Sequence, residues 1–113
     1  MLRTALRAAG VAEVASYADL SVSGLGTLEP DLLVCDLDRL DVDRLEFLRR
    51  VRFVLPECLI AVYTADLHRI WSRACHLAGA NCLLAKASSE NDVAMGVRQT
   101  LRSGCFTDRR FVT

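Results

Sequence analysis

Three apolar runs, each followed directly by a polar residue, constrain the fold of this 113-residue chain more than any other feature. The runs and the residues that follow them are Leu32–Cys35 with Asp36, Cys58–Tyr63 with Thr64, and Cys82–Ala85 with Lys86. Continuous apolar runs of this length are typical of strands that are covered on both faces. Segments with helical spacing separate them, so the sequence predicts an α/β domain with a mainly parallel sheet.

The remaining elements follow from periodicity and from helix-end signals. Helices are expected over residues 2–9, 45–55, 67–78 and from the Ser89 cap to Gly104, with a short strand over 11–17. In the third helix Ile70, Ala74 and Leu77 are expected to face inward, and in the last helix Val93, Val97 and Leu101. The expected domain covers residues 1–104, and residues 105–113 are expected to be a polar tail or the start of a linker.

Composition excludes several classes of function. Fourteen basic residues balance fourteen acidic ones, which argues against a polyanion binder that works through bulk charge. No apolar stretch approaches the ~18 residues of a membrane-spanning helix, and the start of the chain has no apolar signal core, so we expect a cytoplasmic protein. The five cysteines lack paired spacing and are expected to be reduced thiols.

Asp36, Thr64 and Lys86 are the candidate site. In a parallel sheet the carboxyl ends of the strands face one crevice, so these three side chains should converge there. A carboxylate can accept a phosphoryl group, while a hydroxyl and an ammonium can hold its oxygens. Lys86 is also the single lysine beside thirteen arginines. The alternative is a simple Asp36–Lys86 ion pair, with Thr64 as an ordinary strand-end residue.

The order and spacing of these segments resemble the receiver domains of bacterial two-component response regulators, nearest the LuxR/NarL-type subgroup. The matching segments are Pro30–Leu37, Asp43–Leu48, Ile60–Ala65 and Ala78–Lys86. The resemblance implies a flavodoxin-like (CheY-like) three-layer sandwich with a doubly wound parallel sheet. It also implies that Asp36 is the phosphoacceptor, Thr64 the switch hydroxyl and Lys86 the phosphate-binding lysine.

The sequence departs from that family at several positions. It begins at the family's first helix, without the first strand and the acidic pair that holds Mg²⁺, so it is either a truncated copy of a receiver or a degenerate one. Asp36 and Asp38 are then the metal ligands that are left, and we expect a weak Mg²⁺ site or none. Leu83 stands at the position of the usual switch aromatic residue. Labelling by acetyl phosphate is therefore expected to be slow or undetectable.

The leading hypothesis is a receiver-type signalling module that takes its phosphoryl group from a sensor histidine kinase or a phosphotransfer protein. It is not expected to be an enzyme acting on a free metabolite. The alternative is a pseudo-receiver, a phosphorylation-independent module for protein–protein interaction. A flavodoxin-like enzyme or cofactor binder is a distant third, because no Gly-rich phosphate loop and no Ser-His or Cys-His pairing supports it.

Arg69, Trp71 and Arg73 are the candidate interface residues. An exposed tryptophan flanked by arginines has the composition of an interface hot spot, here for a homodimer or another partner protein. The alternative is that Trp71 packs onto its own domain. Direct DNA binding by this chain is not expected, because no helix-turn-helix follows and the net charge is zero.

Overall fold

Four parallel strands form the sheet in the described part of the chain. The computed structural model describes residues 2–10, 24, 25, 27, 29–38 and 43–111. The strands are β1 (Leu32–Cys35), β2 (Leu59–Thr64), β3 (Cys82–Ala85) and β4 (Phe106–Thr107), in the spatial order β1-β2-β3-β4. The register pairs Cys35 with Val62 and Thr64 with Ala85. The predicted mainly parallel sheet is thus confirmed, while the strand expected over 11–17 lies outside the described residues.

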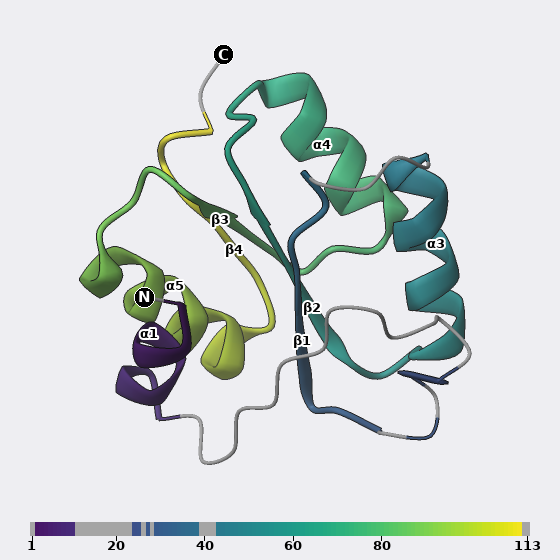
Figure 1. The fold of residues 1–113 in the computed structure, drawn as a ribbon, viewed down its shortest axis with the longest axis horizontal. Coiled ribbons are helices and arrows are strands. Elements are labelled where there is room, and N and C mark those ends of the chain that lie inside the picture. The colour runs from purple at the N-terminus through teal and green to yellow at the C-terminus, as the bar shows by residue number, and fades with distance from the viewer. Residues whose placement is uncertain (1, 11–23, 26, 28, 39–42, 112–113) are drawn as a thin grey trace.

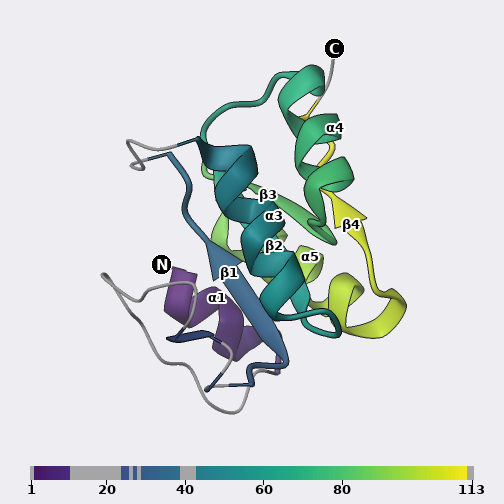
Figure 2. The same ribbon diagram turned by 90° about the vertical axis from the view of Figure 1, so that its right-hand side faces the viewer.

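Helices cover both faces of the sheet. They are α1 (Leu2–Ala8), α3 (Arg44–Val54), α4 (Arg69–Ala78) and α5 (Glu90–Ser103). Figure 1 shows α1 and α5 on one side of the strands and α3 and α4 on the other, and Figure 2 shows α3 and α4 in front of the sheet. Among the described residues, no helix combines the length and the apolar character that a bilayer crossing requires.

Among the residues that the structure describes, the core consists of two apolar clusters, one on each face of the sheet. Alternate residues of β2 divide between them: Ile60 and Val62 face α3 and α4, whereas Ala61 faces α1 and α5. Because both faces are covered, the strands need no polar alternation, and this is why they read as continuous apolar runs.

The inward face of α4 differs from the expected one. Ile70 and Leu77 are 84% and 83% exposed, and the buried positions include Trp71 and Cys75 instead. Two apolar stripes lie side by side on this short helix, about 100° apart, so periodicity alone cannot choose between them. Burying tryptophan removes more apolar surface from water than burying isoleucine, which favours the observed face.

The inward face of α5 also differs from the expected one. Val93 and Val97 are buried as expected, but Leu101 is 43% exposed and Thr100 is fully buried in its place. The Thr100 hydroxyl donates to the carbonyl of Gly96 at 2.8 Å, and this hydrogen bond satisfies it inside the core. A buried threonine is therefore tolerated where an apolar residue was expected.

Residues 105–111 belong to the folded domain, contrary to the expectation of a polar tail or linker. Phe106 and Thr107 form β4, which pairs with β3. Gly96 makes room for this strand, since a Cβ atom there would lie 2.5 Å from the Phe106 ring. Phe111 is buried in the main core cluster. Two residues are too short a strand to give a periodicity signal, so the sequence did not reveal it.

Candidate functional site

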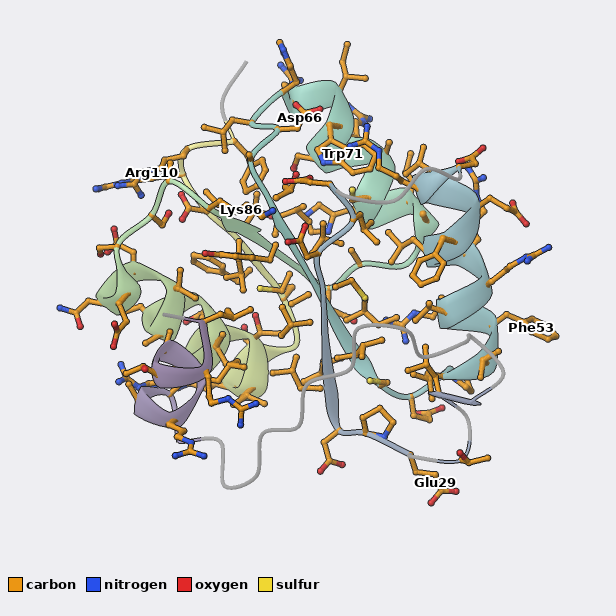
Figure 3. All side chains as sticks on the ribbon, in the orientation of Figure 1. Glu29, Phe53, Asp66, Trp71, Lys86 and Arg110 are labelled. Carbon is orange, nitrogen blue, oxygen red and sulfur yellow. The ribbon has the colours of Figure 1, made fainter. Side chains whose placement is uncertain are left out.

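The side chains of Asp36 and Lys86 meet at the carboxyl end of the sheet. Asp36 directly follows β1, and Lys86 directly follows β3. The Lys86 Nζ atom lies 2.8 Å from Asp36 Oδ2 and 2.9 Å from Oδ1. Figure 3 places Lys86 and Trp71 toward the end of the molecule opposite Glu29. The predicted approach of the carboxylate to the ammonium is therefore found.

Thr64 lies at the same end but contacts Asp38 rather than Asp36. Its Oγ1 donates to Asp38 Oδ1 at 2.6 Å, and its backbone carbonyl accepts from the amide of Lys86 at 2.9 Å. Thr64 is fully buried. The hydroxyl is thus held at the junction of β2 and β3 by the register of the strands.

Within the described part of the chain, the Asp38 side chain receives three donors. Besides the Thr64 hydroxyl, these are the backbone amide of Ala65, 2.8 Å from Oδ2, and the Lys86 ammonium, 3.1 Å from Oδ2. Sequence reasoning had named Asp38 as a metal ligand and missed this arrangement. The only signal was its position two residues after Asp36, which does not say where the side chain points.

Electrostatics keep Asp38 and Lys86 ionised. Burial acts to raise the pKa of the Asp38 carboxyl, but hydrogen bonds from Thr64, Ala65 and Lys86 and the Lys86 charge outweigh it, so the pKa is lowered. Burial acts to lower the pKa of Lys86, but hydrogen bonds to Asp36 and Asp38 and their charges outweigh it and raise it. Asp38 and Lys86 are therefore charged at neutral pH.

Asp36 is the more accessible of the two carboxylates. Its side chain is 41% exposed, against 20% for Asp38. Asp36 Oδ1 accepts from Lys86 and from the backbone amide of Asp38, at 3.1 Å, while its Oδ2 contact is with Lys86. A reagent from solvent therefore reaches Asp36 more readily than Asp38.

These residues do not fit a strong Mg²⁺ site. The Lys86 ammonium lies between the carboxylates of Asp36 and Asp38 and already interacts with both. A divalent cation at the same oxygens would be placed beside that positive charge. Within the part of the chain that the structure describes, no group of three or more His, Cys, Asp or Glu residues could hold a metal ion.

Trp71 connects the site to the core. Its side chain is buried, with 8% of the residue exposed, and its Nε1 donates to Thr64 Oγ1 at 3.3 Å. The guanidinium of Arg44 lies over its ring, 4.1 Å from the centroid. The predicted interface of Arg69, Trp71 and Arg73 is therefore wrong: the arginines are exposed, but Trp71 packs onto its own domain.

Leu83, at the position where the resemblance implies an aromatic switch, is fully buried within β3. It pairs with Val62 on one side and with Thr107 on the other. A buried aliphatic side chain inside the sheet offers no aromatic rotamer to couple Thr64 to the surface.

The loop after Lys86 is fastened to the C-terminal segment. The Ser88 hydroxyl donates to Asp108 Oδ2 at 2.5 Å, and Asp108 is buried. Arg110 donates to Ser88 Oγ at 3.1 Å and lies 3.4 Å from Asp92 Oδ2, at the start of α5. These residues, which sequence reasoning missed, fix the loop that carries Lys86.

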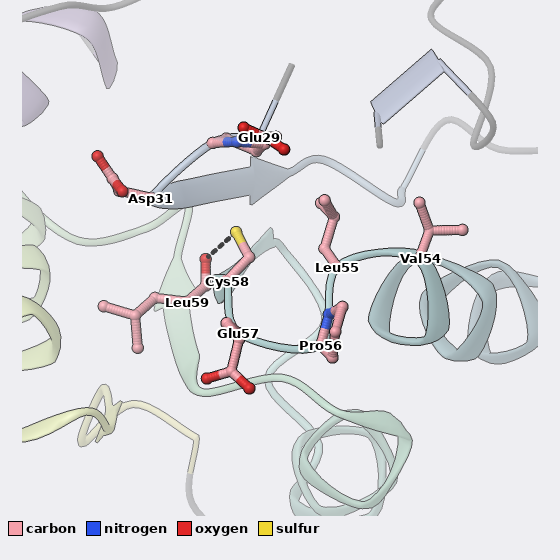
Figure 4. Close-up of a pocket in the computed structure, with 9 residues that line it drawn as sticks. Glu29, Asp31, Val54, Leu55, Pro56, Glu57, Cys58 and Leu59 are labelled. Carbon is pink, nitrogen blue, oxygen red and sulfur yellow. Dashed lines mark hydrogen bonds between the residues drawn. The ribbon is translucent and has the colours of Figure 1, made fainter. Parts of the chain in front are cut away.

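A hollow of about 570 Å³ lies at the opposite end of the sheet (Figure 4). Its lining includes Asp31 and Leu59, at the starts of β1 and β2, and the thiol of Cys58. Burial raises the pKa of that thiol, so it is a poor nucleophile at neutral pH. This hollow is separate from the site formed by Asp36, Asp38 and Lys86.

Comparison of this chain with protein-family models and with curated proteins finds no match.

Proposed function

We propose that this chain is a receiver-type signalling module in which Asp36 accepts a phosphoryl group. The observation that supports it most is the approach of Lys86 Nζ to both oxygens of Asp36 at the carboxyl ends of parallel strands. Ligands of open parallel sheets bind at this edge. In this proposal the fold is a doubly wound, flavodoxin-like sheet, consistent with helices on both of its faces.

The proposed reaction needs a nucleophile, a counter-charge and a donor. One oxygen of Asp36 forms a bond to phosphorus as the bond between phosphorus and the donor breaks. The donor leaves with the electron pair, as acetate from acetyl phosphate or as a histidine from a kinase or phosphotransfer partner. The Lys86 ammonium, close to Asp36, is placed to balance charge on the phosphoryl oxygens.

A phosphorylation-independent interaction module is the second candidate. The observation that favours it is the pairing of Asp38 with Thr64, Ala65 and Lys86. These donors are the ones that a phosphoryl group on Asp36 would need, and a carboxylate already takes them up. In this case the site would hold one conformation without any phosphoryl transfer.

Labelling with radioactive acetyl phosphate, with and without Mg²⁺, separates the two candidates. We expect slow label on the wild type and none on Asp36→Asn. Asp31→Asn is the matched control, because it removes an exposed carboxylate at the other end of β1 and should label like the wild type. Label that persists in Asp36→Asn would contradict the proposal. Absence of label from both the wild type and Asp38→Ala would favour the second candidate, the phosphorylation-independent module.

A further inference from the structure

The groups around Asp38 form a cradle for an oxyanion. It consists of the Thr64 hydroxyl, the Ala65 backbone amide and the Lys86 ammonium, which come from the ends of two neighbouring strands. All three donate hydrogen bonds, and one carries a full positive charge. Such a donor set suits the oxygens of a phosphate-like anion as well as those of a carboxylate.

Asp38 fills this cradle with both of its oxygens. Oδ1 takes the Thr64 hydroxyl, and Oδ2 takes the Ala65 amide and the Lys86 ammonium. The chain also places Asp38 two residues after Asp36, whose carboxylate binds the same ammonium. An anion on or beside Asp36 would therefore have to compete with Asp38 for its donors.

We propose that Asp38 is an internal competitor of a tetrahedral oxyanion: its carboxylate occupies the anion cradle and must leave before a phosphate-like group can enter. The identification of that group as a phosphoryl on Asp36 rests on the proposed function. The existence of the cradle and its occupation by Asp38 do not.

Trp71 provides a direct signal for the state of the cradle. It is the single tryptophan of the chain, and its Nε1 donates to the Thr64 oxygen that in turn donates to Asp38. Exchange of the Asp38 carboxylate for another anion changes the charge next to this hydrogen bond. The intrinsic fluorescence of Trp71 should therefore report, without a label, whether Asp38 or another anion occupies the cradle.

The test is a titration with inorganic phosphate, followed by Trp71 fluorescence and by the NMR shift of the Ala65 amide. We expect Asp38→Ala to bind phosphate roughly tenfold more tightly than the wild type, or better. Asp36→Asn is the matched control, because it also removes one negative charge beside Lys86 but leaves the Asp38 carboxylate in the cradle. Its gain should stay below about threefold. The double variant with Asp38→Ala and Lys86→Met should lose the tighter phosphate binding of Asp38→Ala.

Equal gains in Asp38→Ala and Asp36→Asn would overturn the proposal, because they would show an effect of charge alone. No gain in Asp38→Ala would overturn it as well. If that variant does not fold, Asp38→Asn serves in its place. The asparagine side chain keeps the shape of the aspartate, but either its N–H group faces and repels the backbone N–H of Ala65, or it gives up the hydrogen bond from Thr64.

The proposed function can fail separately. If Asp38→Ala binds phosphate but acetyl phosphate still leaves Asp36 unlabelled, the internal competitor stands and the acceptor role falls. If acetyl phosphate labels Asp36 as fast in the wild type as in Asp38→Ala, the acceptor role stands and the competitor falls.

Discussion

Replacing Thr64 by valine should destabilise this protein more than the loss of one hydroxyl usually does. The Thr64 hydroxyl donates to Asp38 and accepts from Trp71 Nε1 and from the backbone amide of Asp66, at 3.1 Å. Valine has nearly the same shape, so no cavity opens, and the effect comes from the lost hydrogen bonds.

The size of the effect follows from those partners. A hydrogen bond to a charged group contributes about 1.5–3 kcal/mol, and a buried donor left without an acceptor costs about 1–3 kcal/mol. Asp38 keeps two of its three donors, and Asp66 is only half-buried, so the low ends of both ranges apply. We expect Thr64→Val to lower the free energy of unfolding by about 2.5 kcal/mol, out of a typical total of about 5–15 kcal/mol.

Urea unfolding followed by circular dichroism measures this loss. With a slope near 1.5 kcal/mol per molar urea, the midpoint should fall by about 1.7 M. Thr100→Val is the control, since Thr100 is equally buried but donates within its own helix, and it should lose less than about 1 kcal/mol. Equal losses in the two variants would refute the role given to the Thr64 hydroxyl.

Three further outcomes are expected. The pKa of Asp38 is lower in the folded state, so its contribution to stability is present above the unfolded pKa of about 3.9 and is lost as pH falls through the folded pKa. The free energy of unfolding of Asp38→Asn, plotted against pH, should lack this acid-dependent loss. A variant curve parallel to that of the wild type would contradict this. A thiol reagent should modify Cys105 quickly and the other four cysteines only after denaturation, because they are buried, and fast reaction of a second thiol in the native protein would be inconsistent with their burial. Phe111→Ala should cost about 3 kcal/mol in urea unfolding, whereas Phe53→Ala, at a residue 88% exposed, should stay within about 0.5 kcal/mol, and similar losses would show that the C-terminal segment does not pack on the core.

The strands that carry the site could be predicted from the sequence, because each is an apolar run with helices over both faces of its sheet, and a polar residue follows the run. The approach of Asp36 to Lys86 followed from the rule that parallel strands share a carboxyl edge. Signals at helix ends were equally informative: the Ser89 hydroxyl caps α5 by accepting from the amide of Asp92, as expected.

Other features had no local signal. The two-residue strand β4 depends on partners in β3 that lie 24 residues away in the chain, and on the room that Gly96 leaves for Phe106. The face of α4 was decided by where Trp71 meets Thr64, which is a tertiary contact. The Asp38 side chain turned toward Thr64 and Ala65 because the β2 end offers it two donors, and no pattern around Asp38 indicates that.

The most direct test of the proposed function is to map the phosphorylated residue in Asp38→Ala. The protein is treated with acetyl phosphate, the acyl phosphate is reduced to fix its position, and the peptides are sequenced by mass spectrometry. We expect the modification on Asp36, the more exposed carboxylate against Lys86, and its loss in the double variant with Asp36→Asn. A phosphoryl group on any other residue, or none on Asp36 after prolonged treatment, would contradict the assignment of Asp36 as the acceptor.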